Sequence, residues 1–188
     1  ANAAIGLMEP TGNGIGGDLF ALVWIEKDKK LYGLNASGRS PRNLTLNYFK
    51  ENGYKKIPSY GALSISVPGC VDGWFELHEK FGKIKMEEIL DPAIDYAKNG
   101  FPVTELVSYY MNFSSRFYSS YPNYKETYLI NGKSPKKGQI FKNPYLAKTL
   151  SIISKKGRKG FYEGEIAEKI SEVVISQGGF ITIEDLKN

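Results

Sequence analysis

The order of three segments near the start of the chain constrains the fold most strongly. Residues 12–17, "GNGIGG", satisfy the Gly-x-Gly-x-x-Gly pattern of dinucleotide-binding loops. Such a loop binds a pyrophosphate only where a strand precedes the glycines and a helix follows them. Here an Ala-rich helical segment, residues 1–8, comes first, and the apolar run "DLFALVWIE", residues 18–26, follows as a strand. The reversed order argues against a dinucleotide site.

Local patterns predict the remaining elements. The polar run "KDKK" is expected to join residues 18–26 to a second strand at residues 30–35, forming a hairpin. A further strand is expected in "YGALSISVPG", and Thr182 with Asp185 resembles a capping box at a helix start. Helices are predicted at residues 44–51 with Asn43 as N-cap, at 71–81, at 86–99 with Gly100 closing the helix, after Pro144, and around 166–174.

Aromatic residues recur every three or four positions between residues 105 and 124. If one helix persists over this segment, they lie along one side of it. Core or subunit packing is the favoured interpretation, and an apolar wall facing an acyl substrate is the alternative. The residues are Tyr110, Phe113, Phe117, Tyr121 and Tyr124.

Composition and charge exclude several function classes. With 188 residues, 41% hydrophobic and 24% charged, the chain is interpreted as a globular, single-domain fragment covering residues 1–188. The net charge is +5, but the lysines are scattered, so no nucleic-acid partner is predicted. No apolar run reaches the roughly 20 residues of a membrane span. The first residues have the composition of the end of a helix, so we expect that an N-terminal part of a longer protein is missing. The compartment, cytoplasmic or exported, is therefore not predicted.

The rarest reactive residues give little support for metal or redox chemistry. Cys70 is the only cysteine and His78 the only histidine, so we predict no disulfide, no metal site and no cofactor. A nucleophilic Cys-His pair is a weaker interpretation than a small buried thiol and a surface histidine.

Five phrases, in order, resemble the large-subunit region of the gamma-glutamyltranspeptidase family, which belongs to the N-terminal-nucleophile hydrolases. They cover nearly the whole chain. The phrases are "MEPTGNGIGGDLFALVW", "LNASGRSP", "SISVPGCVDGWFELHEKFGKIKMEEILDPAIDYAKNGFPVTE", "NPYLAKTLSIISKKGRKGFYEGEIAEKI" and "GGFITIEDL".

The resemblance implies an α+β fold, a four-layer αββα sandwich to which this chain contributes part. It also implies a proenzyme that cleaves itself, exposing a threonine at the start of a small subunit. The freed α-amino group can act as general base for the weakly nucleophilic hydroxyl. None of the six threonines of this chain lies in a phrase like that of the nucleophile, so no catalytic residue is assigned here and the small subunit is the expected partner.

The resemblance also suggests where substrate binds. In transpeptidases of the family, an arginine just after the second core strand binds the α-carboxylate of the γ-glutamyl group. Counting back from Pro41, Ser37 occupies that place and Arg39 lies two residues later. Either the loop brings Arg39 to the same carboxylate, or the substrate carries an acyl group other than γ-glutamyl. The alternative without a binding role is that Arg39 is an exposed loop arginine.

The glycine-rich loop is expected to shape the pocket. Gly14, Gly16 and Gly17 are predicted to permit backbone conformations and close approach at a helix-to-strand corner. Asp18 is interpreted as a pocket residue or a turn carboxylate.

Three hypotheses of function follow. The leading one is hydrolysis or transfer of the γ-glutamyl group of glutathione and related amides. The others are an acylase for a different amide, and a non-catalytic protein that retains the fold.

Overall fold

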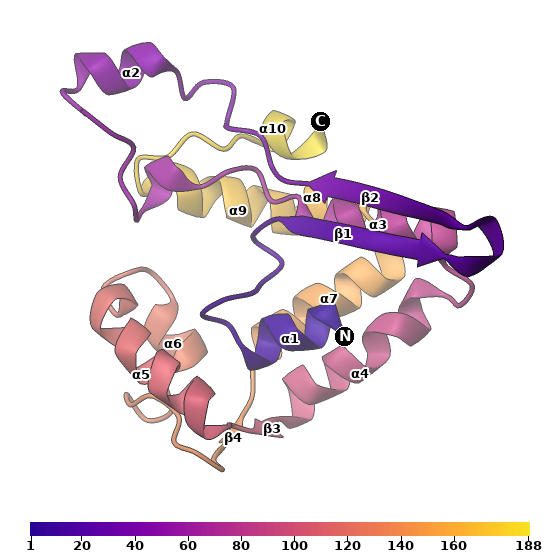
Figure 1. Cartoon of the computed structure of the whole chain (residues 1–188). Coiled ribbons are helices and arrows are strands. Elements are labelled where there is room, and N and C mark those ends of the chain that lie inside the picture. Colours follow the sequence, from indigo (N-terminus) through magenta and orange to yellow (C-terminus); the bar gives the residue numbers. More distant parts are fainter. The chain divides into compact units, whose positions relative to one another are not determined.

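The computed structural model describes all residues, 1–188, and they form two compact units (Figure 1). The first unit consists of Ala1–Gly14 and Ile84–Lys155, and the second of Ile15–Lys83 and Lys156–Asn188. Helices and strands are mixed in the chain, as the predicted α+β class requires. No helix combines the length and apolar content needed to cross a bilayer.

The first unit is a set of helices around a small apolar core. Helix α1 packs against α4, and β3 pairs antiparallel with β4. The helix predicted at residues 86–99 is confirmed, and Gly100 closes it at a φ of +97°, a conformation that favours glycine. The elements are α1 (Asn2–Met8), α4 (Met86–Asn99), β3 (Phe101–Pro102), α5 (Glu105–Tyr118), α6 (Tyr124–Tyr128), β4 (Ile140–Phe141) and α7 (Pro144–Lys156). The core consists of Leu7, Ala97, Phe101, Val103, Met111, Phe141 and Ala147.

The aromatic series does not lie along one helix. Helix α5 ends at Tyr118, and a turn separates it from α6. The core-facing residue of α5 is Met111, whereas Tyr110, Phe113 and Phe117 are about half exposed. These three residues therefore do not pack in the core of this chain, because they lie on the opposite side of α5 from Met111. Packing against another subunit stays a prediction.

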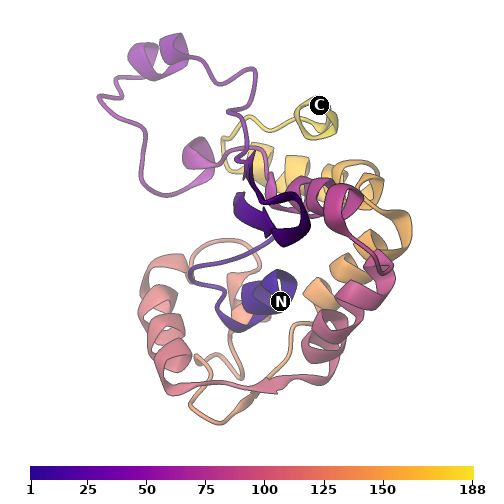
Figure 2. The same ribbon diagram turned by 45° about the vertical axis from the view of Figure 1, so that its right-hand side comes forward.

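The second unit is built on a β-hairpin covered by a helix (Figures 1 and 2). Strands β1 (Leu19–Ile25) and β2 (Lys30–Ala36) pair antiparallel in a register from Leu19↔Ala36 to Ile25↔Lys30, which confirms the predicted hairpin. The connection is a 3₁₀ turn, η1 (Glu26–Asp28), ending at Lys29 in the left-handed conformation. Helix α3 (Cys70–Phe81) packs against both strands. Side chains along β1 alternate between half-buried and exposed, as expected for a sheet covered on one face.

Two local predictions in this unit are wrong. Helix α2 (Leu46–Glu51) begins after Thr45, whose side chain accepts a hydrogen bond from the Tyr48 N–H, so Thr45 and not Asn43 is the N-cap. The strand expected in "YGALSISVPG" does not form. Instead, η2 (Ala62–Ser64) is a 3₁₀ turn, and the segment after it bonds a loop rather than a neighbouring strand.

Two of the three C-terminal helices of the second unit agree with the sequence patterns, and the short first one was not predicted. Helices α8 (Lys159–Tyr162) and α10 (Ile183–Lys187) both contact α9 (Glu165–Ser176). Thr182 and Asp185 form the predicted capping box at the start of α10. These helices and their flanking residues bring Arg158, Tyr162 and Asp185 beside the end of β2.

The turn at residues 67–69 lies directly against the chain leaving β2. The Val67 N–H donates to the Arg39 carbonyl at 2.9 Å. A Cβ added to Gly38 would lie 1.5 Å from the Val67 carbonyl oxygen, and one added to Gly69 would lie 2.1 Å from that of Ala36. Backbone therefore touches backbone here, and only glycine fits at both positions.

We predict that Gly38→Ala strongly destabilises the protein. The Val67 carbonyl belongs to the backbone and cannot rotate away, so the turn must separate from the loop. We expect the free energy of unfolding to fall by about 3 kcal/mol, as for other overpacked sites, measured by urea denaturation of the purified protein. Gly16→Ala is the matched control, because nothing lies within 4 Å of a Cβ at Gly16. Equal losses in the two variants would contradict the prediction.

Candidate functional site

A pocket of about 320 Å³ lies at the end of β2 in the second unit. Four segments that are distant in sequence form its wall: the loop after β2, the turn before α3, the first half of α3, and the C-terminal helices. The pocket is lined by polar and ionisable side chains that could bind a ligand: Ser37, Arg39, Asp72, Glu76, Arg158 and Tyr162.

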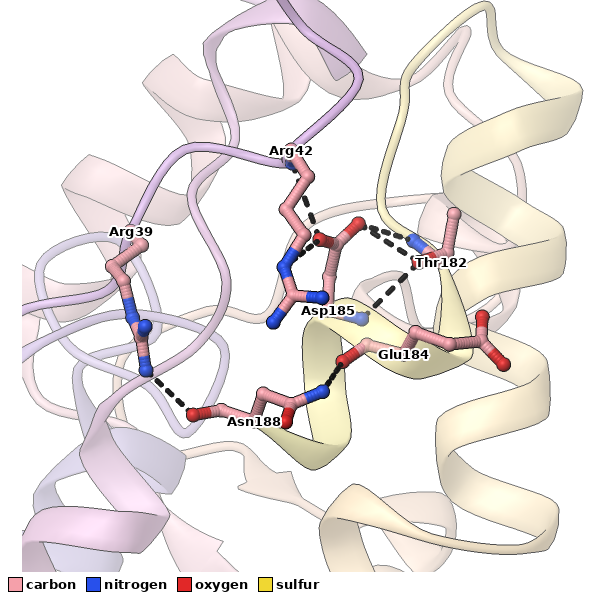
Figure 3. Close-up of polar contacts among 6 residues, drawn as sticks. All are labelled: Arg39, Arg42, Thr182, Glu184, Asp185 and Asn188. Carbon is pink, nitrogen blue, oxygen red and sulfur yellow. Dashed lines mark hydrogen bonds and ion pairs between the residues drawn. The ribbon is translucent and has the colours of Figure 1, made fainter.

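Ser37 and Arg39, both predicted as site residues, line this pocket. The Ser37 N–H donates to the Asn35 side chain at 2.9 Å. The guanidinium of Arg39 donates to the backbone carbonyl of Asn188 at 2.5 Å, and both residues are seen in Figure 3. This is the only hydrogen bond of the Arg39 side chain, and its guanidinium forms no ion pair. Arg39 is thus an exposed cation at a pocket wall without a carboxylate partner.

The other pocket arginine is neutralised by its neighbours. Arg158 forms an ion pair with Asp72, and its guanidinium lies over the ring of Tyr162 at 4.6 Å from the ring centroid. Such stacking and pairing satisfy the cation within the protein. Of the two arginines in the wall, only Arg39 keeps its charge available to a ligand.

The glycine-rich segment supports the pocket through its last residues. The carbonyl of Gly17 accepts hydrogen bonds from the N–H groups of Gly69 and Cys70 at 3.0 and 2.9 Å. The Asp18 carboxylate accepts one from the Gly38 N–H at 2.8 Å. Asp18 therefore holds the loop that carries Arg39, and it is not among the residues that line the pocket.

Gly14 and Gly16 do not have the close contacts or the backbone conformation predicted for them. Neither has a positive φ, and a Cβ on either would meet no atom of this chain within 4 Å. Beside the end of β2, the glycines that permit close approach are instead Gly38, Gly69 and Gly73, where a Cβ would clash with neighbouring strand or loop atoms. The sequence pattern predicted close backbone contacts at the glycine cluster, whereas those beside the end of β2 occur at isolated glycines.

A buried carboxylate anchors the far wall of the pocket (Figure 3). The Asp185 side chain is 3% exposed and accepts hydrogen bonds from the Thr182 N–H at 3.0 Å and hydroxyl at 2.9 Å, and from the Arg42 N–H at 3.2 Å. Burial opposes its ionisation, but these hydrogen bonds and the charge of Arg42 outweigh burial and lower the pKa of Asp185. The network ties the loop after β2 to α10.

Several residues with a potentially nucleophilic group are buried or cap helices. Cys70 is buried, and burial raises the pKa of its thiol to about 11, so it is protonated at neutral pH and a poor nucleophile. Three of the six threonines, Thr45, Thr104 and Thr182, accept hydrogen bonds as N-caps of helices. His78 is half-buried. No three His, Cys, Asp or Glu side chains cluster as a metal site would require.

A second pocket, of about 410 Å³, lies within the first unit. Tyr121 and Tyr124 of the aromatic series line it, together with Tyr118 and Tyr128. Burial raises the pKa values of Tyr124 and Tyr128, so their hydroxyls stay neutral. No charged side chain lines this pocket.

Sequence reasoning missed Asp72, Arg158, Tyr162 and Asp185 as site residues. Asp185 was noted only as part of a capping box. The others lie in phrases that carry the family resemblance, but nothing in a single sequence shows that residues 72 and 158 meet. A charged pair separated by 86 positions is visible only in three dimensions.

The chain belongs to the gamma-glutamyltranspeptidase family, because the family's sequence model, described as "Gamma-glutamyltranspeptidase", matches residues 1–188. Among curated proteins, it is 35% identical over 187 residues to the glutathione hydrolase-like YwrD proenzyme of Bacillus subtilis (strain 168), covering 99% of this chain and 35% of that protein.

Solved structures agree with this assignment. The chain matches Helicobacter pylori gamma-glutamyltranspeptidase with a TM-score of 0.92 and 30% identity, covering 100% of this chain and 54% of that one. It matches cephalosporin acylase from Bacillus halodurans with a TM-score of 0.90 and 36% identity, covering 98% and 35%. The family resemblance and the α+β fold are thereby confirmed. The chain spans about a third of the length of the curated relatives it matches.

We predict that Asp185→Asn destabilises the protein in a pH-dependent way. The folded-state pKa of Asp185 lies below its ordinary value of 3.8, so its ionised form stabilises the fold above that pH, and this contribution is lost as the pH falls through the lower folded pKa. We expect a loss of about 2 kcal/mol at pH 7, from the hydrogen bonds to a buried carboxylate, measured by urea unfolding.

The difference between wild type and Asp185→Asn should stay constant from neutral pH down to about pH 5 and shrink below about pH 4. Asp28→Asn, at an exposed turn residue, is the control and should show no such convergence. A difference that persists unchanged into acid would mean that the charge of Asp185 is not what stabilises α10.

Proposed function

We propose that the complete protein is a gamma-glutamyltransferase-like enzyme that hydrolyses or transfers the γ-glutamyl group of glutathione and related amides. The observation that carries this proposal is the position of Arg39. It lies in the loop after β2 at a pocket wall, and its guanidinium has no carboxylate partner. A guanidinium presents parallel N–H donors that match a carboxylate, so the α-carboxylate of a γ-glutamyl group would complete the pairing.

In this proposal, Arg39 takes the role of the arginine that is expected at position 37, where this chain has Ser37. Its small side chain occupies the position that the family resemblance assigns to an arginine, and both Ser37 and Arg39 line the same pocket. The intervening Gly38 is held by Asp18 and by the turn at Val67. This support would direct Arg39 toward the pocket instead of leaving it on a mobile loop.

The nucleophile is proposed to be a threonine of a small subunit that this chain does not contain. Its hydroxyl would attack the amide carbonyl, with the freed α-amino group taking the hydroxyl proton. The amine leaves with a proton, and an ester to the threonine remains until water or an acceptor amine takes the acyl group. The Bacillus subtilis relative is a proenzyme, which supports a precursor that is processed.

A second candidate function is an acylase that cleaves a different amide. Two observations favour it: Ser37 replaces the expected arginine, and the matched Bacillus halodurans structure is a cephalosporin acylase. If the acyl group of the substrate has no α-carboxylate, Arg39 has no ionic role. A non-catalytic protein would instead remain an intact precursor, without a new N-terminal threonine in mass spectrometry.

We predict that Arg39→Ala raises the KM for a γ-glutamyl anilide by about 10- to 100-fold, because a charge-assisted pair of about 1.5–3 kcal/mol is lost. Arg39→Lys should recover part of this loss, since an ammonium keeps the charge but not the fork. Release of the chromogenic amine from the processed enzyme measures both.

Arg116→Ala is the matched control, because Arg116 is an exposed arginine of α5 that lines neither described pocket wall. A KM that Arg39→Ala leaves unchanged would contradict carboxylate binding and favour the acylase. No turnover by a correctly processed enzyme would exclude γ-glutamyl anilides as substrates.

A further inference from the structure

Tyr162 is a buried tyrosine whose hydroxyl joins two elements of the second unit. It lies at the end of α8 and is 1% exposed. Its hydroxyl donates to the Pro68 carbonyl at 2.7 Å and accepts from the Asp72 N–H at 3.0 Å. The phenol therefore bonds the last turn before α3 and the first turn of α3 at once.

Helix α3 needs this hydroxyl because its own sequence provides no cap. The N-cap residue is Gly69, which has no side chain to accept from the free N–H groups of the first turn. Gly17 and Tyr162 accept them instead: the Gly17 carbonyl serves Gly69 and Cys70, and the Tyr162 hydroxyl serves Asp72. Both caps come from elsewhere in the chain.

The turn that Tyr162 holds is the surface on which the Arg39 loop rests. Pro68 lies between Val67 and Gly69, and both of these touch the chain from Ala36 to Arg39 through backbone atoms. The contact leaves no space for a methyl group. A movement of the Pro68 carbonyl is therefore transmitted to the Arg39 backbone, because no flexible side chain separates the two.

Tyr162 is itself held in place from its other side. The Arg158 guanidinium lies over the Tyr162 ring and forms an ion pair with Asp72. The N–H of the same Asp72 donates to the Tyr162 hydroxyl. Phe161 packs edge-on against the same ring, with centroids 4.9 Å apart. Burial raises the pKa of the Tyr162 hydroxyl, which keeps it protonated and able to donate to Pro68.

We propose that Tyr162 is a positioning residue for Arg39: its hydroxyl fixes the turn at residues 67–69, and the turn fixes the direction of the arginine at the pocket wall. This inference rests on the proposed function, since Arg39 is taken as the carboxylate-binding group. Tyr162 touches no substrate in this role and acts only through the backbone of the turn.

The test compares Tyr162→Phe with wild type in the complete processed enzyme. We expect KM for the γ-glutamyl anilide to rise about 3- to 10-fold with kcat within about twofold, because a misdirected arginine weakens binding; tenfold corresponds to about 1.4 kcal/mol. Faster hydrogen exchange is expected in peptides covering residues 66–73 and 36–41. Tyr145→Phe, an exposed tyrosine outside this unit, is the control and should change neither.

A double mutant separates positioning from general destabilisation. In the Arg39→Ala background, Tyr162→Phe should raise KM no further, because the group it positions is absent. An equal rise in both backgrounds would overturn the inference. So would unchanged exchange and unchanged KM in Tyr162→Phe while Arg39→Ala raises KM.

Failure of the proposed function has a different signature. In that case Arg39→Ala leaves KM unchanged, while Tyr162→Phe still accelerates exchange at residues 66–73. If Tyr162→Phe does not fold, Arg158→Met is the milder variant: it keeps the hydroxyl but removes the guanidinium from the ring. We expect smaller changes in exchange and KM in the same direction, and no change in either would count against the inference.

Discussion

The second unit depends on the contact between the turn at residues 67–69 and the chain that leaves β2. At Gly38 and Gly69 the two backbones approach so closely that a Cβ would overlap a carbonyl oxygen. Such a contact is stiffer than packing between side chains, because carbonyl groups have no rotamers to change. The hairpin, the start of α3 and the Arg39 loop are therefore placed as one assembly, and the pocket is formed at their junction.

The same contact explains why the glycine-rich segment matters without binding a phosphate. A helix N-terminus does lie at the end of that segment, but it belongs to α3, which follows much later in the chain. The Gly17 carbonyl occupies it, accepting from the N–H groups of Gly69 and Cys70. Free N–H groups that hold an anion in a dinucleotide site are here satisfied by the protein's own backbone. The glycine-rich segment thus shares the sequence pattern of a phosphate-binding loop but not its structure.

Elements with strong local patterns could be predicted from the sequence, and those set by distant partners could not. The apolar stripe of α4, the hairpin and the Thr182 capping box are encoded within a few residues of each other. The strand expected at residues 60–69 had suitable residues but no partner strand, because its backbone bonds the Arg39 loop. The single helix over residues 105–124 that would place the aromatic residues on one side does not form, because a turn ends α5 although the aromatic spacing continues past it.

The candidate site shows the same division. Family phrases led to Ser37 and Arg39, and the structure places both at one pocket, although their binding role stays a prediction. Tyr162 could not be found in this way, because its importance comes from two hydrogen bonds to residues about 90 positions earlier. A hydroxyl that replaces a missing N-cap can be inferred only after both the helix start and its surroundings are known.

The hairpin presents a second face that the rest of the second unit does not cover. On β1, Phe20, Leu22 and Trp24 are 68%, 78% and 53% exposed, while the alternate residues of the strand are half-buried. A strand with apolar residues on both faces is typical of a sheet that is covered on both sides. The solved Helicobacter pylori relative is nearly twice the length that this chain covers. The αββα arrangement that the family resemblance implies has two sheets packed face to face, so the exposed apolar face of the hairpin is where a second sheet would pack.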